Sequence, residues 1–488
     1  MSSGRPSRQK LVVCPVRPWD AGPVTTESTE STEPTESTES TERDLPATAE
    51  ALGRGALDWL VGSARDTGNG LAWAETATGE ELDPILYSGT AGIVLALLEG
   101  QEHFGDDRYG DAAARGALTL AAAAEEWEAS SLYTGLTGMA VALHAVHERL
   151  GDTAAGAAAD RAMERVRSRF DGTRWDDRWF DLLIGNGGIA LGALAVGDEE
   201  LAVRAVTPYL RTAERTADGV QWESLSGAPA RFHHLSHGTL GIAYALAATG
   251  RAAGRPDLTE LAVAGASDVI ARNEAGPTGF LVPHSDPQHV PDRIERYSYG
   301  WCHGPTGDAQ AFRLLAAALQ DPSWSALADG CWHTVTHSGL PQRLRPGFWD
   351  NNGRCCGTAG VLALACDRQV EHGDGLDFAN ILVADLAARA TEDANGARWS
   401  NTEHRATPTE LEPHLGWGMG NAGIARELLR YARLGMGRQA GYAVDWPDHP
   451  AAWSELGHDS DRQLRCPLGE GVGRLLTQIP LDRDLGQE

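Results

Sequence analysis

The stretch "YSGTAGIVLALLEG" (residues 87–100) decides the fold, because its pattern recurs along the chain. Two glycines, Gly89 and Gly92, stand three residues apart and open a segment rich in alanine and leucine with helical periodicity. A single G-x-x-G of this kind would indicate only close helix packing. The pattern returns six more times, with first glycines at Gly135, Gly185, Gly238, Gly304, Gly357 and Gly420. Seven copies in register predict a repeat architecture.

The repeat length indicates what each unit contains. Successive first glycines are 46, 50, 53, 66, 53 and 63 residues apart, which is too long for one helix and fits a helix pair with its loops. The amphipathic segments 109–129 and 259–275 lie between motifs and are expected to form outer helices with their polar faces in water. Alternating β-branched runs are scarce. We therefore expect an all-α fold of seven helix pairs in a stacked or closed array.

Composition and charge limit the partners. The chain has 488 residues, of which 42% are hydrophobic and 22% charged, as is typical of soluble globular proteins. Its formal net charge of −27 argues against nucleic acid or an anionic membrane surface as a partner. No stretch approaches the roughly 20 apolar residues of a membrane span, and the N-terminus lacks a secretory apolar run. Seven thinly spread cysteines do not indicate a disulfide framework, so we expect a cytoplasmic protein with reduced thiols.

The two ends of the chain differ from the repeat region. Residues 25–42 read "TTESTESTEPTESTESTE", which has no apolar residue to bury, so residues 1–44 are expected to be a disordered, acidic Ser/Thr/Glu-rich tail. Helical periodicity begins near residue 45, and residues 45–440 are expected to form one folded domain. Residues 441–488 are rich in Gly, Pro and Asp, and are interpreted as a C-terminal extension of uncertain role.

Cysteine and histidine gather at three of the seven turns. The fourth motif has His237 directly before its glycine, the fifth has Cys302 and His303, and the sixth has Cys355 and Cys356. If the repeats close into a ring, these positions converge at one end of a central cavity. Thiolates and imidazoles are ligands that zinc prefers, and three protein ligands leave one tetrahedral position open, as in catalytic zinc sites.

The residues alone leave the ligand set open. Cys302, Cys355 and Cys356 are the candidate ligands, while His303 is an alternative to Cys356 or a residue that lines the cavity. A disulfide between the adjacent Cys355 and Cys356 would be strained. Each thiol also has a plainer interpretation as a small buried apolar residue, which is the role expected for Cys331 and Cys366.

The sevenfold G-x-x-G pattern, together with "SHGTLG" (236–241), "WCHGPTG" (301–307) and "CCGTAG" (355–360), resembles the lanthipeptide cyclases of the LanC family. The resemblance extends from about residue 45 to about residue 440. It implies an α/α toroid of seven outer and seven inner helices around a zinc centre. It also implies the family's reaction, in which cysteine thiols add to dehydroalanine or dehydrobutyrine in a precursor peptide and close lanthionine or methyllanthionine thioether rings.

The resemblance assigns roles to the cysteines. Cys302 matches the first zinc cysteine of the family and Cys355 matches the second. Cys356 stands where the family motif has histidine, and a three-cysteine set is similar to that of some family members. A third thiolate makes the centre more negative, which weakens zinc as a Lewis acid and leaves a bound substrate thiolate more nucleophilic.

The resemblance also implies three catalytic candidates. His237 matches the family histidine of the fourth motif, and Asp181 matches the aspartate four residues before the third G-x-x-G, so the two are expected to act as an acid–base pair. Asp181 is also a candidate helix cap. The family arginine four residues before the first zinc cysteine is replaced by Ser298, and Arg296, two residues earlier, is the candidate substitute.

The chain has no room for a kinase, lyase or dehydratase domain. We therefore expect a stand-alone, zinc-dependent cyclase that acts on a dehydrated precursor peptide after a separate dehydratase. One alternative retains the zinc chemistry but adds glutathione to dehydroamino acids in damaged proteins, and a neighbouring precursor-peptide gene would decide between the two. The other alternative is a non-catalytic peptide-binding scaffold in a lanthipeptide synthetase complex, which the intact cysteines and His237 disfavour.

Overall fold

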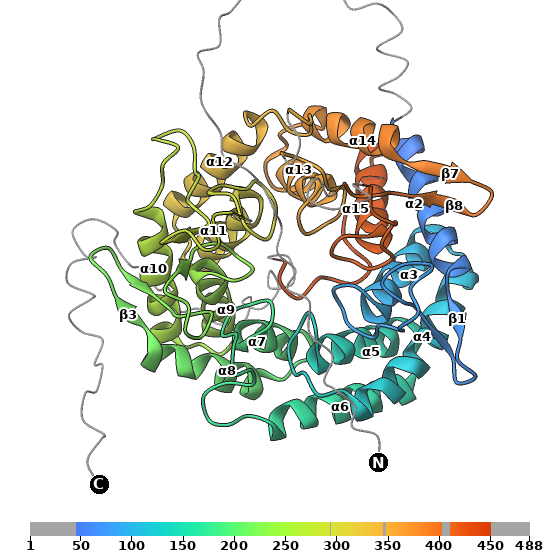
Figure 1. Cartoon of the computed structure of the whole chain (residues 1–488), viewed down its shortest axis with the longest axis horizontal. Coiled ribbons are helices and arrows are strands. Elements are labelled where there is room, and N and C mark those ends of the chain that lie inside the picture. The colour runs from blue at the N-terminus through green and yellow to red at the C-terminus, as the bar shows by residue number, and fades with distance from the viewer. Residues whose placement is uncertain (1–44, 293, 345–347, 403–409, 450–488) are drawn as a thin grey trace, which may run out of the picture.

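The computed structural model describes residues 45–292, 294–344, 348–402 and 410–449. Within these residues the helices form two concentric rings (Figure 1). Seven helices form the inner ring: α3 (Thr90–Phe104), α5 (Leu136–Leu150), α7 (Asn186–Ala195), α9 (Thr239–Ala252), α11 (Pro305–Leu319), α13 (Thr358–His372) and α15 (Asn421–Gly435). Seven more surround them: α2 (Leu45–Gly62), α4 (Asp107–Glu126), α6 (Thr153–Ser168), α8 (Glu199–Thr212), α10 (Pro256–Ile270), α12 (Pro322–Thr336) and α14 (Asp377–Arg389). The prediction of an α/α toroid with seven outer and seven inner helices is confirmed.

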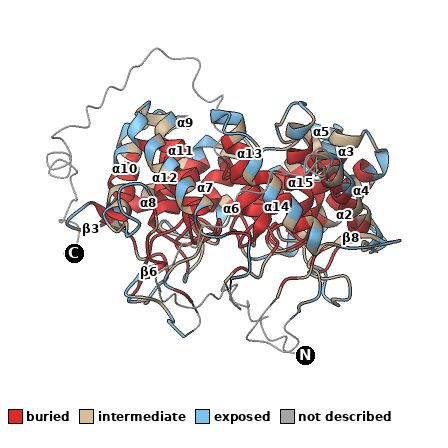
Figure 2. Cartoon of the chain, turned by 90° about the horizontal axis from the view of Figure 1, so that it is seen from above, coloured by how far each residue is buried: buried red, intermediate tan, exposed pale blue. Residues whose placement is uncertain are grey.

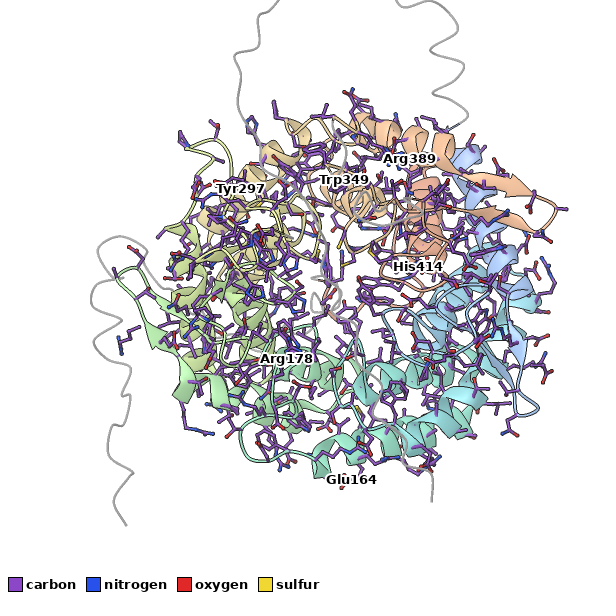
Figure 3. All side chains as sticks on the ribbon, viewed as in Figure 1. Glu164, Arg178, Tyr297, Trp349, Arg389 and His414 are labelled. Carbon is purple, nitrogen blue, oxygen red and sulfur yellow. The ribbon has the colours of Figure 1, made fainter. Side chains whose placement is uncertain are left out.

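The ring closes between its first and last helices. Each inner helix from α3 to α13 packs against the outer helix that follows it, whereas α15 packs against α2, from the other end of the described chain. The inner helices are buried on nearly all sides and the outer ones are amphipathic, with Glu164 of α6 pointing away from the ring (Figure 3). The apolar core therefore lies between the two rings.

The glycine motifs set the start of every inner helix. The first glycine of each motif is the N-cap of its helix and has an extended backbone. The second glycine allows the preceding turn to press against the helix: a Cβ at Gly241 would lie 1.9 Å from the carbonyl oxygen of Leu235. Because real Cβ atoms do not approach oxygen so closely, the motif requires glycine for packing. All the pre-glycine turns consequently lie at one end of the ring.

Four short antiparallel strand pairs lie in the connections. They are β1 (Arg65–Asp66) with β2 (Leu71–Ala72), β3 (Glu214–Arg215) with β4 (Val220–Gln221), β5 (Arg231–Phe232) with β6 (Ser285–Asp286), and β7 (Thr391–Asp393) with β8 (Gly396–Arg398). Strands of two or three residues are too short to give an alternating apolar pattern, so the sequence did not indicate them. In Figure 2, which is turned by 90° from the view of Figure 1, the connection with β6 projects from one side of the helical layer.

Two cysteines belong to the core, as predicted. Cys331 on α12 and Cys366 on α13 are free thiols with no exposed surface. Burial raises the pKa of the Cys366 thiol to about 12. Both thiols are therefore inert packing residues at neutral pH.

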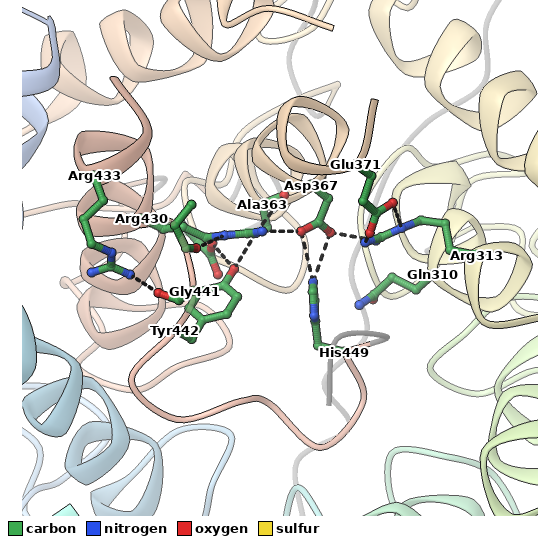
Figure 4. Close-up of polar contacts among 12 residues, drawn as sticks. Gln310, Arg313, Ala363, Asp367, Glu371, Arg430, Arg433, Gly441, Tyr442 and His449 are labelled. Carbon is green, nitrogen blue, oxygen red and sulfur yellow. Dashed lines mark hydrogen bonds and ion pairs between the residues drawn. The ribbon is translucent and has the colours of Figure 1, made fainter. Parts of the chain in front are cut away.

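The chain turns back into the toroid after α15. Residues 441–449, which we call the return segment, contact side chains of the inner ring (Figure 4). The Gly441 carbonyl accepts a hydrogen bond from Arg433 at 2.8 Å, and the Tyr442 hydroxyl donates to Glu427 at 2.7 Å. The backbone N–H of Ala443 donates to Glu99 of α3 at 2.8 Å. This part of the predicted C-terminal extension is thus packed against the ring.

A buried ion network anchors the end of the return segment. Asp367 of α13 contacts Arg313 of α11 at 2.7 Å, Arg430 of α15 at 2.6 Å and His449 at 3.0 Å (Figure 4). Burial alone would raise the pKa of Asp367, but Arg313, His449 and Arg430 hold it well below its ordinary value. Three inner helices and the return segment therefore share one carboxylate. The predicted acidic tail (residues 1–44) and residues 450–488 lie outside the described residues.

Candidate metal centre

Three cysteine thiols meet at the end of the ring where the inner helices begin. Cys302 precedes α11, and Cys355 and Cys356 precede α13. Cys302 Sγ lies 3.0 Å from Cys356 Sγ, which lies 3.3 Å from Cys355 Sγ, and the residues are at most 7% exposed. Within the described residues these three cysteines are the group whose ligand atoms are close enough to hold a metal ion. The structure thus brings together the three thiols that the sequence singled out.

Backbone hydrogen bonds fix this thiol triad across three repeats. The N–H groups of Trp301 and Cys302 both donate to the Cys355 carbonyl, at 3.0 and 3.3 Å. The Cys355 N–H donates in turn to the carbonyl of Gly418, in the turn before α15, at 2.8 Å. The sulfurs are therefore positioned by hydrogen bonds between turns of different repeats.

The triad has the chemistry of a zinc site. Its sulfurs are closer than van der Waals contact, but none of the three cysteines forms a disulfide. A tetrahedral zinc with Zn–S distances of about 2.3 Å separates its sulfurs by about 3.8 Å, so small movements suffice. Burial alone would raise the pKa of the Cys355 thiol, but hydrogen bonds from Cys302 and Cys356 hold it well below its ordinary value. The residues present therefore fit a metal that binds thiolates.

A histidine–aspartate pair lies beside the triad. His237 Nδ1 lies 2.6 Å from Asp181 Oδ2, and the Asp181 side chain is fully buried. Asp181 Oδ1 accepts the N–H groups of Ile184 and Gly185, at 2.8 and 2.9 Å, so the residue also caps the turn before α7. Because a carboxylate only accepts, the histidine carries its hydrogen on Nδ1 and presents Nε2 as the basic nitrogen. Trp179 packs on the imidazole with ring centroids 4.6 Å apart.

Further imidazoles lie next to His237. His303 stacks on His237 with centroids 5.5 Å apart, and His284 lies 4.2 Å from His303. Burial, reinforced by neighbouring histidines, lowers the pKa of His303 and His284 well below the ordinary value, so both are neutral at pH 7. His234 forms a second buried pair with Asp308, whose Oδ2 lies 2.8 Å from its Nδ1. His303 thus lines the site next to His237.

The side chain of Arg296 forms a surface pair, although its backbone carbonyl accepts the His284 N–H at 2.7 Å. Its side chain is 48% exposed, pairs with Glu274 and donates to the Tyr297 hydroxyl at 2.8 Å. In the view of Figure 3, Tyr297 projects over the ring of helices and not over its centre. The structure therefore does not bring this arginine to the thiol triad or to His237.

Aromatic residues from three repeats and the return segment form the wall behind the triad. Trp446 stacks on Trp417 with centroids 4.4 Å apart, and its indole N–H donates to the Tyr133 hydroxyl at 2.9 Å. Tyr133 donates to Asp448, and burial raises the pKa of that carboxyl to about 6. Tyr87 contacts both Tyr133 and Trp417, with centroids 6.3 Å apart in each pair. The wall excludes water from one side of the site.

The signals in the sequence for these residues are unequal. Tyr87 has a positional signal, because it stands two residues before its glycine, as Tyr133 does in the next repeat. His284 lies outside the G-x-x-G turns and reaches the site through the pairing of β5 with β6, where its carbonyl accepts the His233 N–H. Asp448 enters from the return segment. No spacing rule connects these last two positions to the repeats.

The sequence matches one family of known proteins. A family model described as "Lanthionine synthetase C-like protein" matches residues 80–277 and 288–383, which is more than half of the chain. No curated protein has a sequence that matches the chain significantly. Among the described residues no helix is both long and apolar enough to cross a membrane.

The fold is similar to that of solved structures. One is nisin cyclase, with a TM-score of 0.56 and 14% sequence identity over 86% of this chain and 99% of the other. Another is the unsaturated glucuronyl hydrolase of Bacillus sp. GL1, with a TM-score of 0.45 and 16% identity over 82% of this chain and 98% of the other. At 14% identity the match to nisin cyclase concerns the fold alone.

Proposed function

Because the chain belongs to the lanthionine synthetase C-like family, we propose that it is a zinc-dependent peptide cyclase. Its substrate would be a dehydrated precursor peptide, in which cysteine thiols add to dehydroalanine or dehydrobutyrine and form lanthionine or methyllanthionine rings. The observation that carries the proposal is the buried triad of Cys302, Cys355 and Cys356 beside the His237–Asp181 pair. The family makes this chemistry the expectation, and the triad supplies residues suited to it.

The three cysteines would hold the metal. Zinc bound there supplies Lewis acidity, which allows a substrate thiol to ionise near neutral pH. The three sulfurs come from two turns that a third turn supports through Gly418, so the site is preorganised before substrate arrives. Three ligands leave one position for the peptide, and Cys356 in place of a histidine makes the centre one charge more negative.

The His237–Asp181 pair would transfer the proton from the substrate thiol to Cα. The addition forms one S–C bond at Cβ, converts the C=C bond to a single bond and moves one proton from the thiol to Cα, so nothing leaves. Asp181 orients the imidazole and fixes its tautomer, and Nε2 is the nitrogen free to take up and deliver that proton. Trp179 and His303 both pack against the His237 imidazole and restrict its rotation.

We propose further that the protein acts as a stand-alone cyclase in the cytoplasm after a separate dehydratase. None of the described cysteines forms a disulfide, as is expected in a reducing compartment. A dehydrated peptide is the form of substrate that this chemistry requires, because an unmodified serine or threonine has no C=C bond to accept a thiolate. The dehydration reaction must therefore come first.

Single cysteine variants test the proposal. The purified protein should contain about one zinc per chain and should consume the free thiols of a dehydrated peptide without any change in peptide mass. Cys302→Ala, Cys355→Ala and Cys356→Ala should each lose zinc and cyclisation, because two thiolates hold zinc far more weakly than three.

Cys331→Ala is the matched control, since it removes a buried thiol outside the triad. It should retain both zinc and activity. Full zinc occupancy in Cys302→Ala would refute the ligand set. If the enzyme consumed glutathione but closed no ring in any peptide, the result would favour the alternative function, in which glutathione is added to dehydroamino acids.

A further inference from the structure

One buried hydroxyl group beside the thiol triad has no evident structural task. Tyr87 is 5% exposed, and its hydroxyl has no nitrogen or oxygen partner within the described part of the chain. A phenol is protonated at neutral pH, so this hydroxyl can donate a hydrogen bond. A buried polar group without a partner costs free energy, and such groups in native structures usually have a function.

The ring of Tyr87 is held in one orientation. Its carbonyl accepts the Gly418 N–H at 2.8 Å, and the Gly418 carbonyl accepts the Cys355 N–H at 2.8 Å, so a single residue links the tyrosine backbone to the cysteine. The ring lies against Gly418, where a Cβ would come within 2.4 Å of it. Tyr133 and Trp417 meet it edge-on. The hydroxyl therefore cannot swing away from the thiols without displacing this packing.

The equivalent tyrosine of the next repeat, Tyr133, has a hydroxyl with hydrogen-bond partners and serves as a comparison. Tyr133 stands at the same place in its motif, two residues before the first glycine, and is also fully buried. Its hydroxyl donates to Asp448 and accepts from Trp446 at 2.9 Å. Of these two matched tyrosines, only Tyr87 leaves its hydroxyl without a hydrogen-bond partner among the described residues.

We propose that Tyr87 is a positioning residue of the metal centre, whose hydroxyl donates a hydrogen bond to the Cys355 thiolate when the triad holds a metal. The inference rests on the proposed function in one respect, since it requires a metal at the triad. Three thiolates and a divalent cation carry a net charge of −1, and an O–H···S bond stabilises that excess charge on sulfur. Partners of this kind behind a metal ligand typically change metal affinity 10- to 100-fold.

The test replaces the hydroxyl and keeps the ring. Tyr87→Phe should bind one Co²⁺ per chain, as the wild type does, but with affinity about 10-fold weaker. Its sulfur-to-cobalt charge-transfer band should move to longer wavelength, because a thiolate without the hydrogen bond is a better electron donor. The metal-free variant should unfold at the same temperature as the metal-free wild type or higher, because the lost hydroxyl had no partner there.

Tyr133→Phe is the matched control, and it should leave the cobalt spectrum and affinity unchanged while lowering the unfolding temperature. An unchanged spectrum and affinity in Tyr87→Phe would overturn the role of Tyr87 alone. A wild-type protein that binds no Co²⁺ would overturn the metal centre, and with it both the proposed function and this inference. Equal spectral shifts in the two variants would also overturn the inference, because they would point to a general change in the aromatic wall.

Discussion

At the scale of single residues, the site depends on a side chain that both caps a helix and orients a catalytic candidate. Asp181 uses one carboxylate oxygen to cap the turn before α7 and the other to hold His237. The cap is local, whereas the second task needs the next repeat, from which the histidine comes. A change at this position can therefore alter stability and chemistry by separate routes, and the two can be distinguished.

Asp181→Asn should separate them. The asparagine oxygen can still accept the Ile184 and Gly185 N–H groups, so the fold and the zinc content should stay close to wild type. Its NH₂ group cannot accept from His237 Nδ1, so the imidazole would adopt the other tautomer and cyclisation should fall by roughly 10²- to 10⁴-fold. Asp181→Ala should lose the cap as well and destabilise the fold by about 1–2 kcal/mol. Near-normal kcat in Asp181→Asn would show that the pair has no role in proton transfer.

At the scale of elements, the start of each inner helix is the sensitive point. Seven turns press against seven helix N-termini, and each contact is made at a glycine where backbone meets backbone. The turns carry the thiols and His237, so the packing that positions the helices also positions the site. The G-x-x-G pattern is clear in the sequence because every repeat has the same steric requirement for glycine at this contact.

Gly241→Ala should be strongly destabilising. The new Cβ would lie 1.9 Å from the Leu235 carbonyl oxygen, and the turn that carries His237 would have to move. We expect a loss of at least about 2 kcal/mol in the free energy of unfolding, measured with urea. Gly62→Ala is the control: a Cβ at this exposed end of α2 has no neighbour within 4 Å, and helix propensity predicts no loss. Equal stability of both variants would show that the turns can relax.

The return segment gives a second prediction at this scale. Asp367→Asn should destabilise the protein by roughly 3–5 kcal/mol, since it leaves Arg430 buried without its carboxylate partner and leaves Arg313 with Glu371 alone. Asp257→Asn, which removes an exposed pair with Arg255, should change stability by less than about 1 kcal/mol. Urea titrations of the two variants at neutral pH would compare them.

The same network predicts a dependence on pH. The pKa of Asp367 is lower in the folded protein than in the unfolded chain, so its stabilisation is complete above the unfolded value of about 3.9. It is lost as the pH falls toward the folded pKa. The stability difference between wild type and Asp367→Asn should therefore shrink below about pH 4. A difference that stayed constant into strong acid would contradict the network.

At the scale of the whole molecule, the closure of the ring made part of the site predictable. Repeat spacing and the seven glycine pairs indicated helix pairs, and closure implied that the turns with Cys302, Cys355 and His237 would converge. The packing of α15 on α2 provides that closure. The spatial proximity of residues at equivalent turns could thus be predicted, although these residues are far apart in the sequence.

The rest depended on contacts that follow no period. Asp448 reaches the aromatic wall only because the chain turns back after α15, and its Gly- and Pro-rich surroundings gave no sign of this. His284 arrives through a two-residue strand pair, too short to leave a pattern. Arg296 stood close to Cys302 in sequence, but its guanidinium pairs with the exposed Glu274. Proximity in sequence is a weak guide where a loop leaves the repeat.

The most direct test of the central claim is X-ray absorption at the zinc edge of the purified wild-type protein. The account predicts about one zinc per chain with three sulfur neighbours near 2.3 Å and one lighter atom in the fourth position. Two sulfurs with histidine nitrogen in the first shell would show that His303 or His237 replaces a cysteine. An absence of zinc would contradict the account, and the buried thiols would then be packing residues in a toroid that works without a metal.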